Sequence, residues 1–486
     1  MSSCDGRGDR MNRSWSSFFL SVSKGGRSLL MFVAIAYFSR RLPPAQFGVF
    51  FLFFALEGLA SIPADMGISS ALEKRLSEGE AKAGMLGSAL VIKCSLIAVV
   101  TVCLLVSQGY VNAYLGMDVT ILLVFAVVLR ELSLFYIHAV RGNHRVGVTA
   151  PIEFARRLTW VSIGVILVAA GFGVRGLLWS LVAGSGVTFG IAYLTCTVSI
   201  GQPRLDHVRS LVAFSKYDVI SALGGRVYQW MDTAIIGLFL AHQFVSAYEV
   251  AWQVTLLVLL ISKPIALTLF PHISRLQADA STDQIGATIS NALGFATFAS
   301  VPAIVGATIY APAILHYLFG SEYVIAAMVL VVLMVEKLFQ SLNDVISIAV
   351  RAIDRPDLAA KATVASVGVN LILSPILLLM VGFIGVAVAT TFSWLLNTLL
   401  HIHYLSQHVP LNIPYRLIGW YVVASVGMGV VLVGVKTVVP ITGVVVLFFE
   451  VGLGGVIYAA FAVTIPAIRN RIIVPGLQAF GVGSGQ

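Results

Sequence analysis

The stretch MLGSALVIKCSLIAVVTVCLLVS, residues 85–107, indicates the fold class. It holds one charged residue, Lys93, and it is long enough to cross a bilayer, because a spanning helix needs about 20 mostly apolar residues. The whole chain of 486 residues is 58% hydrophobic and 11% charged, with a mean hydropathy of +0.94. Soluble proteins carry roughly 25% charged residues. The composition therefore excludes a soluble enzyme with a membrane anchor and predicts an all-α, polytopic membrane protein.

Gly, Pro and charged residues divide the rest of the chain into similar apolar segments. With residues 85–107 they make fourteen predicted spans, at 16–39, 45–70, 85–107, 118–139, 148–171, 174–198, 214–240, 246–271, 286–311, 323–349, 359–381, 383–405, 417–438 and 441–466. The first 13 residues are polar and basic, and the first span continues into Arg40 and Arg41 without a small-residue cleavage site. We therefore expect an uncleaved first helix and not a signal peptide.

Lys and Arg are distributed unevenly between the two sides of this predicted topology. Of the 31 basic residues, eighteen fall in connections on the side of the amino terminus or within three residues of them, and four do so on the other side: Arg40, Arg41, Arg175 and Lys436. Cytoplasmic loops carry the excess of Lys and Arg. The pattern predicts that both termini are cytoplasmic, in a multi-pass protein of the cytoplasmic membrane. The net charge of +9 then reflects topology, and no nucleic-acid partner is expected.

The cysteines give no sign of a metal or disulfide site. Cys4, Cys94, Cys103 and Cys196 are scattered, and none forms a CxxC pair. We expect no metal site and no cofactor.

Two short motifs recur at about the same spacing and predict an internal repeat. Ala139-Val140-Arg141-x-x-x-Arg145 returns as Ala349-Val350-Arg351-x-x-x-Arg355, and Ala45-Gln46-Phe47 is echoed by His242-Gln243-Phe244. Both fall at matching points of a six-span unit, so the two halves have the same orientation, as in parallel-repeat transporters. We predict an N-terminal lobe over 1–205 (spans 1–6), a C-terminal lobe over 206–408 (spans 7–12), and spans 13–14 with a tail over 409–486.

Charged residues inside the spans are the candidate functional residues, because ionisable groups are costly at membrane depth. Several follow helical spacing and form polar stripes on otherwise apolar helices. The candidate substrate-binding cations are Lys24, Arg27, Arg130, Arg226, Lys263 and Lys337. The candidate acids for charge balance or ion coupling are Glu57, Asp65, Asp218, Asp232, Glu249 and Glu336.

A structural role competes with this functional one for some of the charges. Lys93, Arg156, Arg157 and Lys263 have side chains long enough to reach the membrane interface. The adjacent pairs Arg130–Glu131 and Glu336–Lys337 also suit ion pairing between helices. Both interpretations remain open at this point.

The abundance of cations in the spans favours an anionic cargo. Guanidinium and ammonium groups bind phosphate or carboxylate well. The acids among them can alternate between pairing, protonation and Na⁺ binding, which is the chemistry of ion-coupled alternating access. Na⁺ or H⁺ is therefore the expected coupling ion.

Several short motifs resemble one known family. They are Arg41-Leu42-Pro43-Pro44-Ala45-Gln46-Phe47-Gly48, Asp65-Met66-Gly67, Met231-Asp232-Thr233-Ala234-Ile235-Ile236-Gly237, Ala247-Tyr248 and Leu318-Phe319-Gly320-Ser321-Glu322-Tyr323. Together they resemble the polysaccharide transporter family of oligosaccharide-lipid flippases (O-antigen translocase-like), within the multidrug/oligosaccharidyl-lipid/polysaccharide exporter superfamily. The chain departs from the family pattern at Pro43, where Gly is usual.

The resemblance implies a flippase that moves a phosphate- or diphosphate-linked oligosaccharide lipid across the membrane by rocking of two six-helix lobes. Its partners would be that glycolipid, membrane lipids and polysaccharide-assembly proteins. Two alternatives stay open. A cation-coupled multidrug antiporter of the same superfamily would favour an acidic cavity, and an integral glycosyltransferase or polymerase would usually display a catalytic base on a long outer loop. This chain has many intramembrane cations and no long outer loop.

Overall fold

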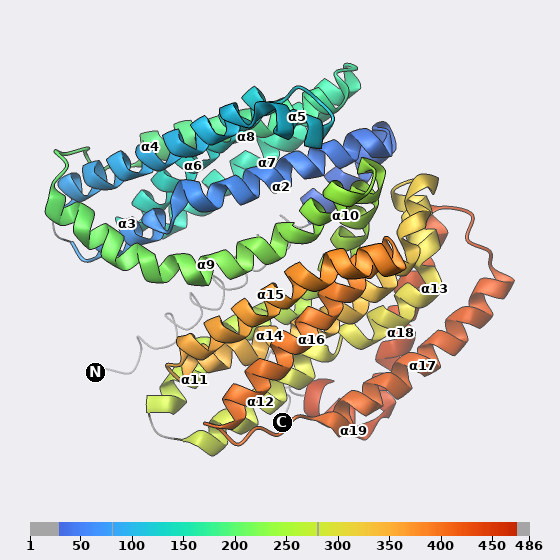
Figure 1. The fold of residues 1–486 in the computed structure, drawn as a ribbon. Coiled ribbons are helices and arrows are strands. Elements are labelled where there is room, and N and C mark those ends of the chain that lie inside the picture. The colour runs from blue at the N-terminus through green and yellow to red at the C-terminus, as the bar shows by residue number, and fades with distance from the viewer. Residues whose placement is uncertain (1–28, 80, 279–280, 474–486) are drawn as a thin grey trace, which may run out of the picture. The chain divides into compact units, whose positions relative to one another are not determined.

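The computed structural model describes residues 29–79, 81–278 and 281–473, and over these residues the chain is helical without any strand. Side chains are described for the same residues except 216–226, 261 and 267. Figure 1 shows the helices as long, roughly parallel rods within each of two compact units, one of residues 37–249 and one of the described residues from 250 to 473 together with 29–36. The predicted all-α membrane fold is confirmed.

Residues 29–41 are helical, and the Tyr37–Glu249 unit continues with eight complete helices and the start of a ninth. These are α2 (Pro44–Asp65), α3 (Ile68–Ser77), α4 (Lys82–Val106), α5 (Gln108–Leu115), α6 (Thr120–Gly142), α7 (Val146–Ala169), α8 (Gly173–Thr195), α9 (Leu205–Phe239) and α10 (His242–Leu256).

The second unit begins within α10. It continues with α11 (Leu259–Ala278), α12 (Thr282–Thr297), α13 (Ser300–Leu318), η1 (Ser321–Ala326), α14 (Ala327–Ala352), α15 (Pro356–Val381), α16 (Ile384–Ser406), α17 (Tyr415–Val438), α18 (Val444–Thr464), α19 (Pro466–Ile468) and η2 (Arg469–Ile473).

Ten stretches of the described chain are long and apolar enough to cross a membrane. They are Pro44–Asp65, Lys82–Val106, Thr120–Gly142, Gly173–Thr195, Thr282–Leu318, Ser321–Ala352, Pro356–Val381, Ile384–Ser406, Tyr415–Val438 and Val444–Thr464. Helix α7 covers the predicted span 148–171 but carries Glu153, Arg156 and Arg157, which make it more polar than these ten. The chain is a multi-pass membrane protein, while the count of fourteen spans and the cytoplasmic termini stay predictions.

Some predicted spans are interrupted. The span expected over 45–70 breaks at Met66 and Gly67, which have φ values of 43° and 74°. The span expected over 286–311 breaks between α12 and α13, because Pro302 has no N–H to donate to the carbonyl of Phe298 and is tolerated only in the first turn of a helix. The span expected over 246–271 is likewise two helices, α10 and α11.

The internal repeat is present in the backbone. Two residues after helix α6 ends, His144 has left-handed backbone (φ 59°), and two residues after α14 ends Asp354 (φ 60°), 210 positions later, does the same. In both turns the next arginine donates its N–H to a carbonyl five residues back, from Arg145 to Val140 and from Arg355 to Val350, each at 3.2 Å. The sequence repeat therefore builds the same helix–turn–helix twice.

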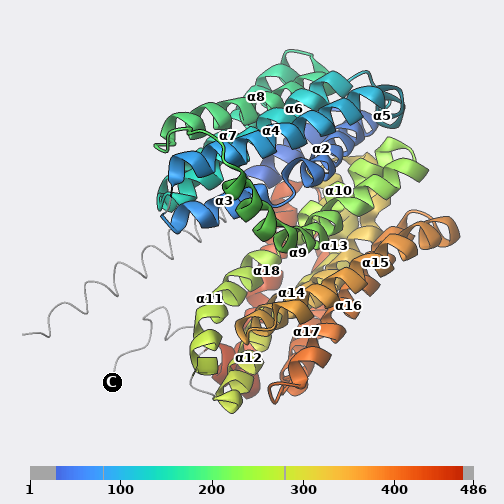
Figure 2. The same ribbon diagram turned by 60° about the vertical axis from the view of Figure 1, so that its left-hand side comes forward.

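Packing repeats as well. Within the first unit α8 packs on α6 and α7, and within the second α16 packs on α14 and α15 (Figures 1 and 2). The lobe boundaries at 205/206 and 408/409 stay predictions, since close contacts divide the chain at 249/250.

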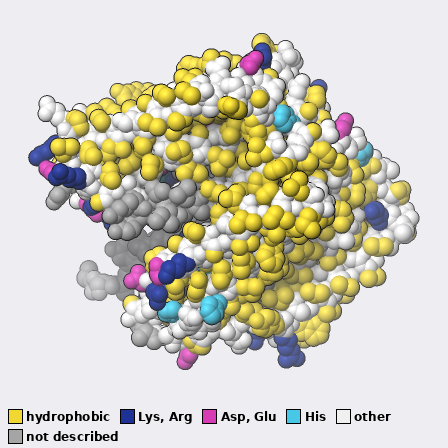
Figure 3. All heavy atoms as spheres, viewed as in Figure 1, with side chains coloured by type: hydrophobic (Ala, Val, Ile, Leu, Met, Phe, Trp, Pro, Cys, Tyr) yellow, Lys and Arg dark blue, Asp and Glu magenta, His cyan; other side chains and the backbone are white. Residues whose placement is uncertain are grey.

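Hydrophobic side chains cover most of the face seen in Figure 3, and the charged side chains visible there lie toward the ends of the helices. Large apolar residues such as Val106, Leu379 and Val445 are strongly exposed. In a water-soluble protein such a surface would aggregate, whereas in a bilayer it faces lipid tails. The polar chemistry of the chain is consequently concentrated between helices.

Candidate functional site

Lys93 forms the centre of a buried ionic network in the first unit. Its ammonium Nζ lies 2.5 Å from Asp65 Oδ1 on α2 and 2.6 Å from Glu131 Oε2 on α6, and its side chain is 0% exposed. Lys93 therefore does not extend to the membrane interface. One cation on α4 instead joins two acids from two other helices.

Two hydroxyls complete this network. Ser61 Oγ donates to Glu131 Oε1, and Ser69 Oγ donates to Asp65 Oδ1. Because Ser61 and Asp65 are four residues apart on α2, they lie on one face of the helix and reach the same Lys93–Glu131 pair, Ser61 at Glu131 and Asp65 at Lys93. Buried carboxylates need such partners, since an uncompensated charge inside a protein is strongly destabilising.

A second ion pair lies nearby on the same helices. Arg130 Nη1 lies 3.1 Å from Glu57 Oε2, and Arg156 of α7 is a further cation within electrostatic range of both. Together with the Lys93 network this gives three acids and three bases between α2, α4, α6 and α7. The predicted acids Glu57 and Asp65 and the predicted cation Arg130 are thus brought together, each with a partner of opposite charge.

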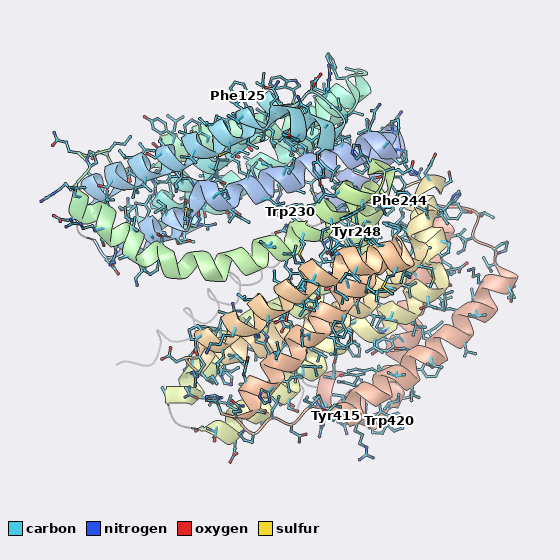
Figure 4. The ribbon with its side chains drawn as sticks, in the orientation of Figure 1. Phe125, Trp230, Phe244, Tyr248, Tyr415 and Trp420 are labelled. Carbon is cyan, nitrogen blue, oxygen red and sulfur yellow. The ribbon has the colours of Figure 1, made fainter. Side chains whose placement is uncertain are left out.

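Two further acids, on helices α9 and α10, accept hydrogen bonds from hydroxyl groups. Tyr248 donates its hydroxyl to Asp232 Oδ2 at 2.6 Å, and Thr233 donates to Glu249 Oε1. All four side chains are buried. Figure 4 labels Tyr248 on α10 and Trp230 on α9. Both predicted acids, Asp232 and Glu249, therefore lie between the two helices of one hairpin.

Three glycines bring α2 against this hairpin. A Cβ on Gly48 would lie 1.9 Å from the carbonyl oxygen of His242, and one on Gly58 would lie 2.3 Å from Trp230 Nε1. A Cβ on Gly237 would lie 2.3 Å from Leu52 Cδ2. Only glycine allows this approach. We call the contact made at Gly48, Gly58 and Gly237 the glycine interface.

The short helix α5 lies at one end of the glycine interface and is hydrogen-bonded to the hairpin twice. The Tyr114 hydroxyl donates to the carbonyl of Ala234 at 2.9 Å, and His242 Nε2 lies 3.1 Å from the carbonyl oxygen of Tyr114. At the same end Ser246 Oγ donates to the carbonyl of Pro44 at 2.8 Å. These bonds join residues before position 205 to residues after it, which is the predicted boundary of the lobes.

The second unit contains a separate buried charge on α14. Lys337 Nζ lies 2.7 Å from Glu336 Oε2, 3.0 Å from Gln340 Oε1 and 3.4 Å from the centre of the Trp252 ring. One turn of α14 beyond Gln340, Asp344 Oδ2 is buried and has no hydrogen-bond partner among the described residues. Lys263 of α11 is exposed but lies within electrostatic range of Lys337 and Asp344.

Some predicted site residues cannot be placed. Lys24 and Arg27 lie outside the described residues, and Asp218 and Arg226 lie on α9 with side chains outside the described part.

Sequence reasoning missed several contacts of the site. The pairing of Lys93 with Asp65 and Glu131 joins helices that no spacing rule connects. The hydrogen bonds of Tyr114 and His242 were missed because each uses a backbone carbonyl, which the spacing of side chains does not reveal. A long polar side chain alone in an apolar run, as Lys93 is, was the available signal for a buried partner.

Comparison with known proteins places these features in a family. Residues 38–329 match the family described as polysaccharide biosynthesis protein. The chain is 40% identical over 441 residues to the probable low-salt glycan biosynthesis flippase Agl15 of Haloferax volcanii, covering 91% of this chain and 93% of that protein. The chain belongs to the polysaccharide biosynthesis protein family. It is also 28% identical to the probable flippase AglR of the same organism, over 90% of this chain and 92% of that one.

Solved structures share the fold at lower sequence identity. The lipid II flippase MurJ in its inward closed conformation superposes with a TM-score of 0.78 at 16% identity, covering 92% of this chain and 98% of that chain. An inward-facing multidrug resistance MATE family transporter of the MOP superfamily gives a TM-score of 0.63 at 16% identity, over 78% and 95% of the two chains. The chain therefore shares its fold with these transporters.

Three of the five motifs that carried the resemblance converge in the structure. Phe47-Gly48 opens α2, the motif from Asp232 to Gly237 lies on α9, and Tyr248 lies on α10. All of them meet at the glycine interface or at the Asp232–Tyr248 hydrogen bond. The family pattern in this part of the chain therefore specifies helix packing.

Proposed function

We propose that this chain is a flippase of the cytoplasmic membrane that moves a phosphate- or diphosphate-linked oligosaccharide lipid across the bilayer. The observation that carries the proposal is the 40% identity to a named flippase of glycan biosynthesis over nine tenths of both chains. In this proposal the protein is a transporter and not an enzyme, and it works beside polysaccharide-assembly proteins.

Alternating access in this protein would open and close the glycine interface. The contact sets three glycines against larger groups and adds a few hydrogen bonds, so its separation would break few polar interactions. Rocking of spans 7–12 against spans 1–6 would break the bonds of Tyr114, His242 and Ser246 first. The buried ion pairs within α2, α4 and α6 would keep that set of helices rigid.

We assign the glycolipid phosphate to the six predicted cations. Arg130 and Lys337 each have an acidic partner, so binding of phosphate there requires exchange of counter-ions. Glu57 or Glu336 would then take up a proton or a Na⁺ ion. Asp65, Asp218, Asp232 and Glu249 are the other candidate carriers of the coupling ion, and Asp344 joins them because of its buried free oxygen.

The multidrug antiporter is the alternative that shares the fold. Its cargo is cationic, whereas this chain carries nine Lys and Arg residues inside the predicted spans and more than three residues from their ends. Efflux of an organic cation by the purified protein, without transfer of glycolipid, would support the antiporter instead.

The experiment is reconstitution of the full chain in liposomes with a fluorescent polyprenyl-phosphate-linked oligosaccharide. Translocation is measured by loss of fluorescence to a membrane-impermeant reductant, in the presence of a Na⁺ gradient, a H⁺ gradient or neither. A second assay expresses the chain in Haloferax volcanii lacking Agl15 and measures recovery of the low-salt glycan by mass spectrometry. No transfer in the liposomes and no recovery in the cells would overturn the proposal.

A further inference from the structure

Two cavities of the first unit meet at Arg175, a residue that the proposed function does not use. One has a volume of about 330 Å³ and is lined by Gln108, Asn112, Asp118, Phe125, Arg175 and Trp179. The other has a volume of about 520 Å³ and is lined by Gln46, Gly116, Gly173, Arg175 and His242, among others. Ligand pockets in proteins usually measure about 300–1,000 Å³, so each is large enough for a small ligand.

The guanidinium of Arg175 is free to bind a ligand. Arg175 is exposed and makes no hydrogen bond or ion pair with any residue that the structure describes. It lies in the first turn of α8, after Gly171 and Gly173, which both have positive φ. A Cβ on Gly173 would lie 3.3 Å from Gln46 Oε1, so these glycines set the start of α8 close to α2. Arg175 is also one of only four cations on the side of the membrane predicted to be external.

The other walls combine amides, one acid and aromatic rings. Asn112 is fixed in place, because its Oδ1 accepts hydrogen bonds from the N–H groups of Val119 and Thr120 and its Nδ2 donates to Asp118 at 3.0 Å. Trp179 and Phe125, the latter labelled in Figure 4, present exposed rings on the same cavity. Flat polar groups beside an aromatic ring suit a sugar. The hydroxyls at the edge of the sugar ring form hydrogen bonds with the polar groups, and the C–H face of the sugar packs on the aromatic ring.

We propose that the smaller cavity, lined by Asn112, Phe125 and Trp179, binds an acidic saccharide, with Arg175 holding its carboxylate, sulfate or phosphate group. Arginine forms bidentate, charge-assisted hydrogen bonds with such oxyanions. Asp118 forms no ion pair with Arg175 and already accepts from Asn112, so it is available to accept hydroxyl groups of the sugar. This inference rests on the proposed function: the ligand is the head group of the glycolipid after the head group reaches the outer side of the membrane.

The smaller cavity is linked to the glycine interface through the larger one, which shares Arg175 with it. His242 lines the larger cavity and also lies 3.1 Å from the carbonyl oxygen of Tyr114. Gln46 belongs to the turn that opens α2, next to Gly48. A saccharide held at Arg175 would therefore touch the end of the interface that must open for its release.

The test measures saccharide binding to the full chain in nanodiscs of zwitterionic lipid, with tryptophan fluorescence as the signal. The probes are a disaccharide containing glucuronate and the matched disaccharide containing glucose. R175Q is expected to weaken binding of the acidic probe at least tenfold and to leave the neutral probe unchanged, and R175K to lie between. K436Q, which removes another cation of the same predicted side, is the matched control. W179F should abolish the fluorescence change if the sugar packs there.

Equal affinity of R175Q and wild type for the acidic probe would overturn the proposal. So would loss of saccharide binding on adding phosphatidylglycerol to the discs, because the site would then belong to a lipid head group. The flippase proposal has a separate outcome. Binding that depends on Arg175 in a protein that transfers no glycolipid would overturn the flippase and leave the saccharide site in place.

Discussion

Lys93 Nζ and Glu131 Oε2 lie 2.6 Å apart, and their side chains are 0% and 1% exposed. The pair joins α4 to α6, and Asp65 extends it to α2 at 2.5 Å. Three helices that are apolar over most of their length are thus held together by charge. In a bilayer, where helix association gains little from burial of apolar surface, such a polar contact fixes which faces meet.

The first prediction concerns the loss of this cation. K93M leaves Asp65 and Glu131 buried with no base between them, which costs about 3–5 kcal/mol for a broken buried pair. The apparent Tm in detergent should fall strongly. K361M removes a surface cation 4.0 Å from Asp357 and should leave the apparent Tm nearly unchanged, because exposed ion pairs add little stability. Equal effects of the two substitutions would contradict the network.

The second prediction separates pairing from cargo binding at Arg130 and Glu57. R130Q and E57Q should each destabilise the protein, and the double variant should lose less than their sum, with a coupling energy of about 0.5–3 kcal/mol. If Arg130 also binds the phosphate, the double variant regains stability but not glycolipid transfer. Recovery of both would restrict Arg130 to a structural role.

The third prediction tests the glycine interface by adding one methyl group. A Cβ on Gly48 meets a backbone carbonyl at 1.9 Å, so G48A must push α2 away from the start of α10. In a background with the four cysteines replaced by serine, S246C should then react faster with a membrane-impermeant thiol reagent, since Ser246 is buried in the closed contact. G190A, on α8 with open space around it, is the control. Unchanged labelling in G48A would show that the interface is looser than described.

The fourth prediction concerns the hydrogen bond from Tyr114 to Ala234. Y114F removes it, and a hydrogen bond contributes about 1 kcal/mol, which corresponds to about a fivefold shift toward the open state. The same S246C labelling should rise by that factor. Tyr110 is exposed on the same helix, so Y110F should leave the rate as it is. A similar rise of the labelling rate in both variants would show that the rate depends on α5 in general and not on the hydrogen bond from Tyr114.

The fifth prediction is a pH dependence at the end of α6. The pKa of Glu73 is lowered, chiefly by its hydrogen bond with His138, whose Nδ1 lies 2.6 Å from Glu73 Oε2. A depressed folded pKa adds stability above the unfolded pKa of about 4.3, and that stability is lost as the pH falls through the folded value. Wild type should therefore have a higher Tm than E73Q at pH 7, and the difference should shrink below about pH 4. A constant difference down to pH 3 would exclude this linkage.

The sequence predicted the repeat well because its signal is local. The turn at Arg141–Arg145 and its copy at Arg351–Arg355 use the same hydrogen bonds within seven residues, so identical letters give identical backbones. The breaks at Met66 and near Pro302 were less predictable. Met66 is not a residue type that favours left-handed backbone, and Pro302 lies in the first turn of α13, so it marks a break only once the start of α13 is known.

Sequence alone determined that the chain crosses a membrane many times, that one helix–turn–helix occurs twice, and that its charges lie on a few helix faces. These properties depend on hydrophobicity and on spacing along one helix. Only the tertiary structure decided that Lys93 binds Asp65 and Glu131, that Gly48 meets His242, and that Arg175 joins two cavities. Partners on different helices are set by how whole helices pack, and side-chain spacing within one helix does not carry that information.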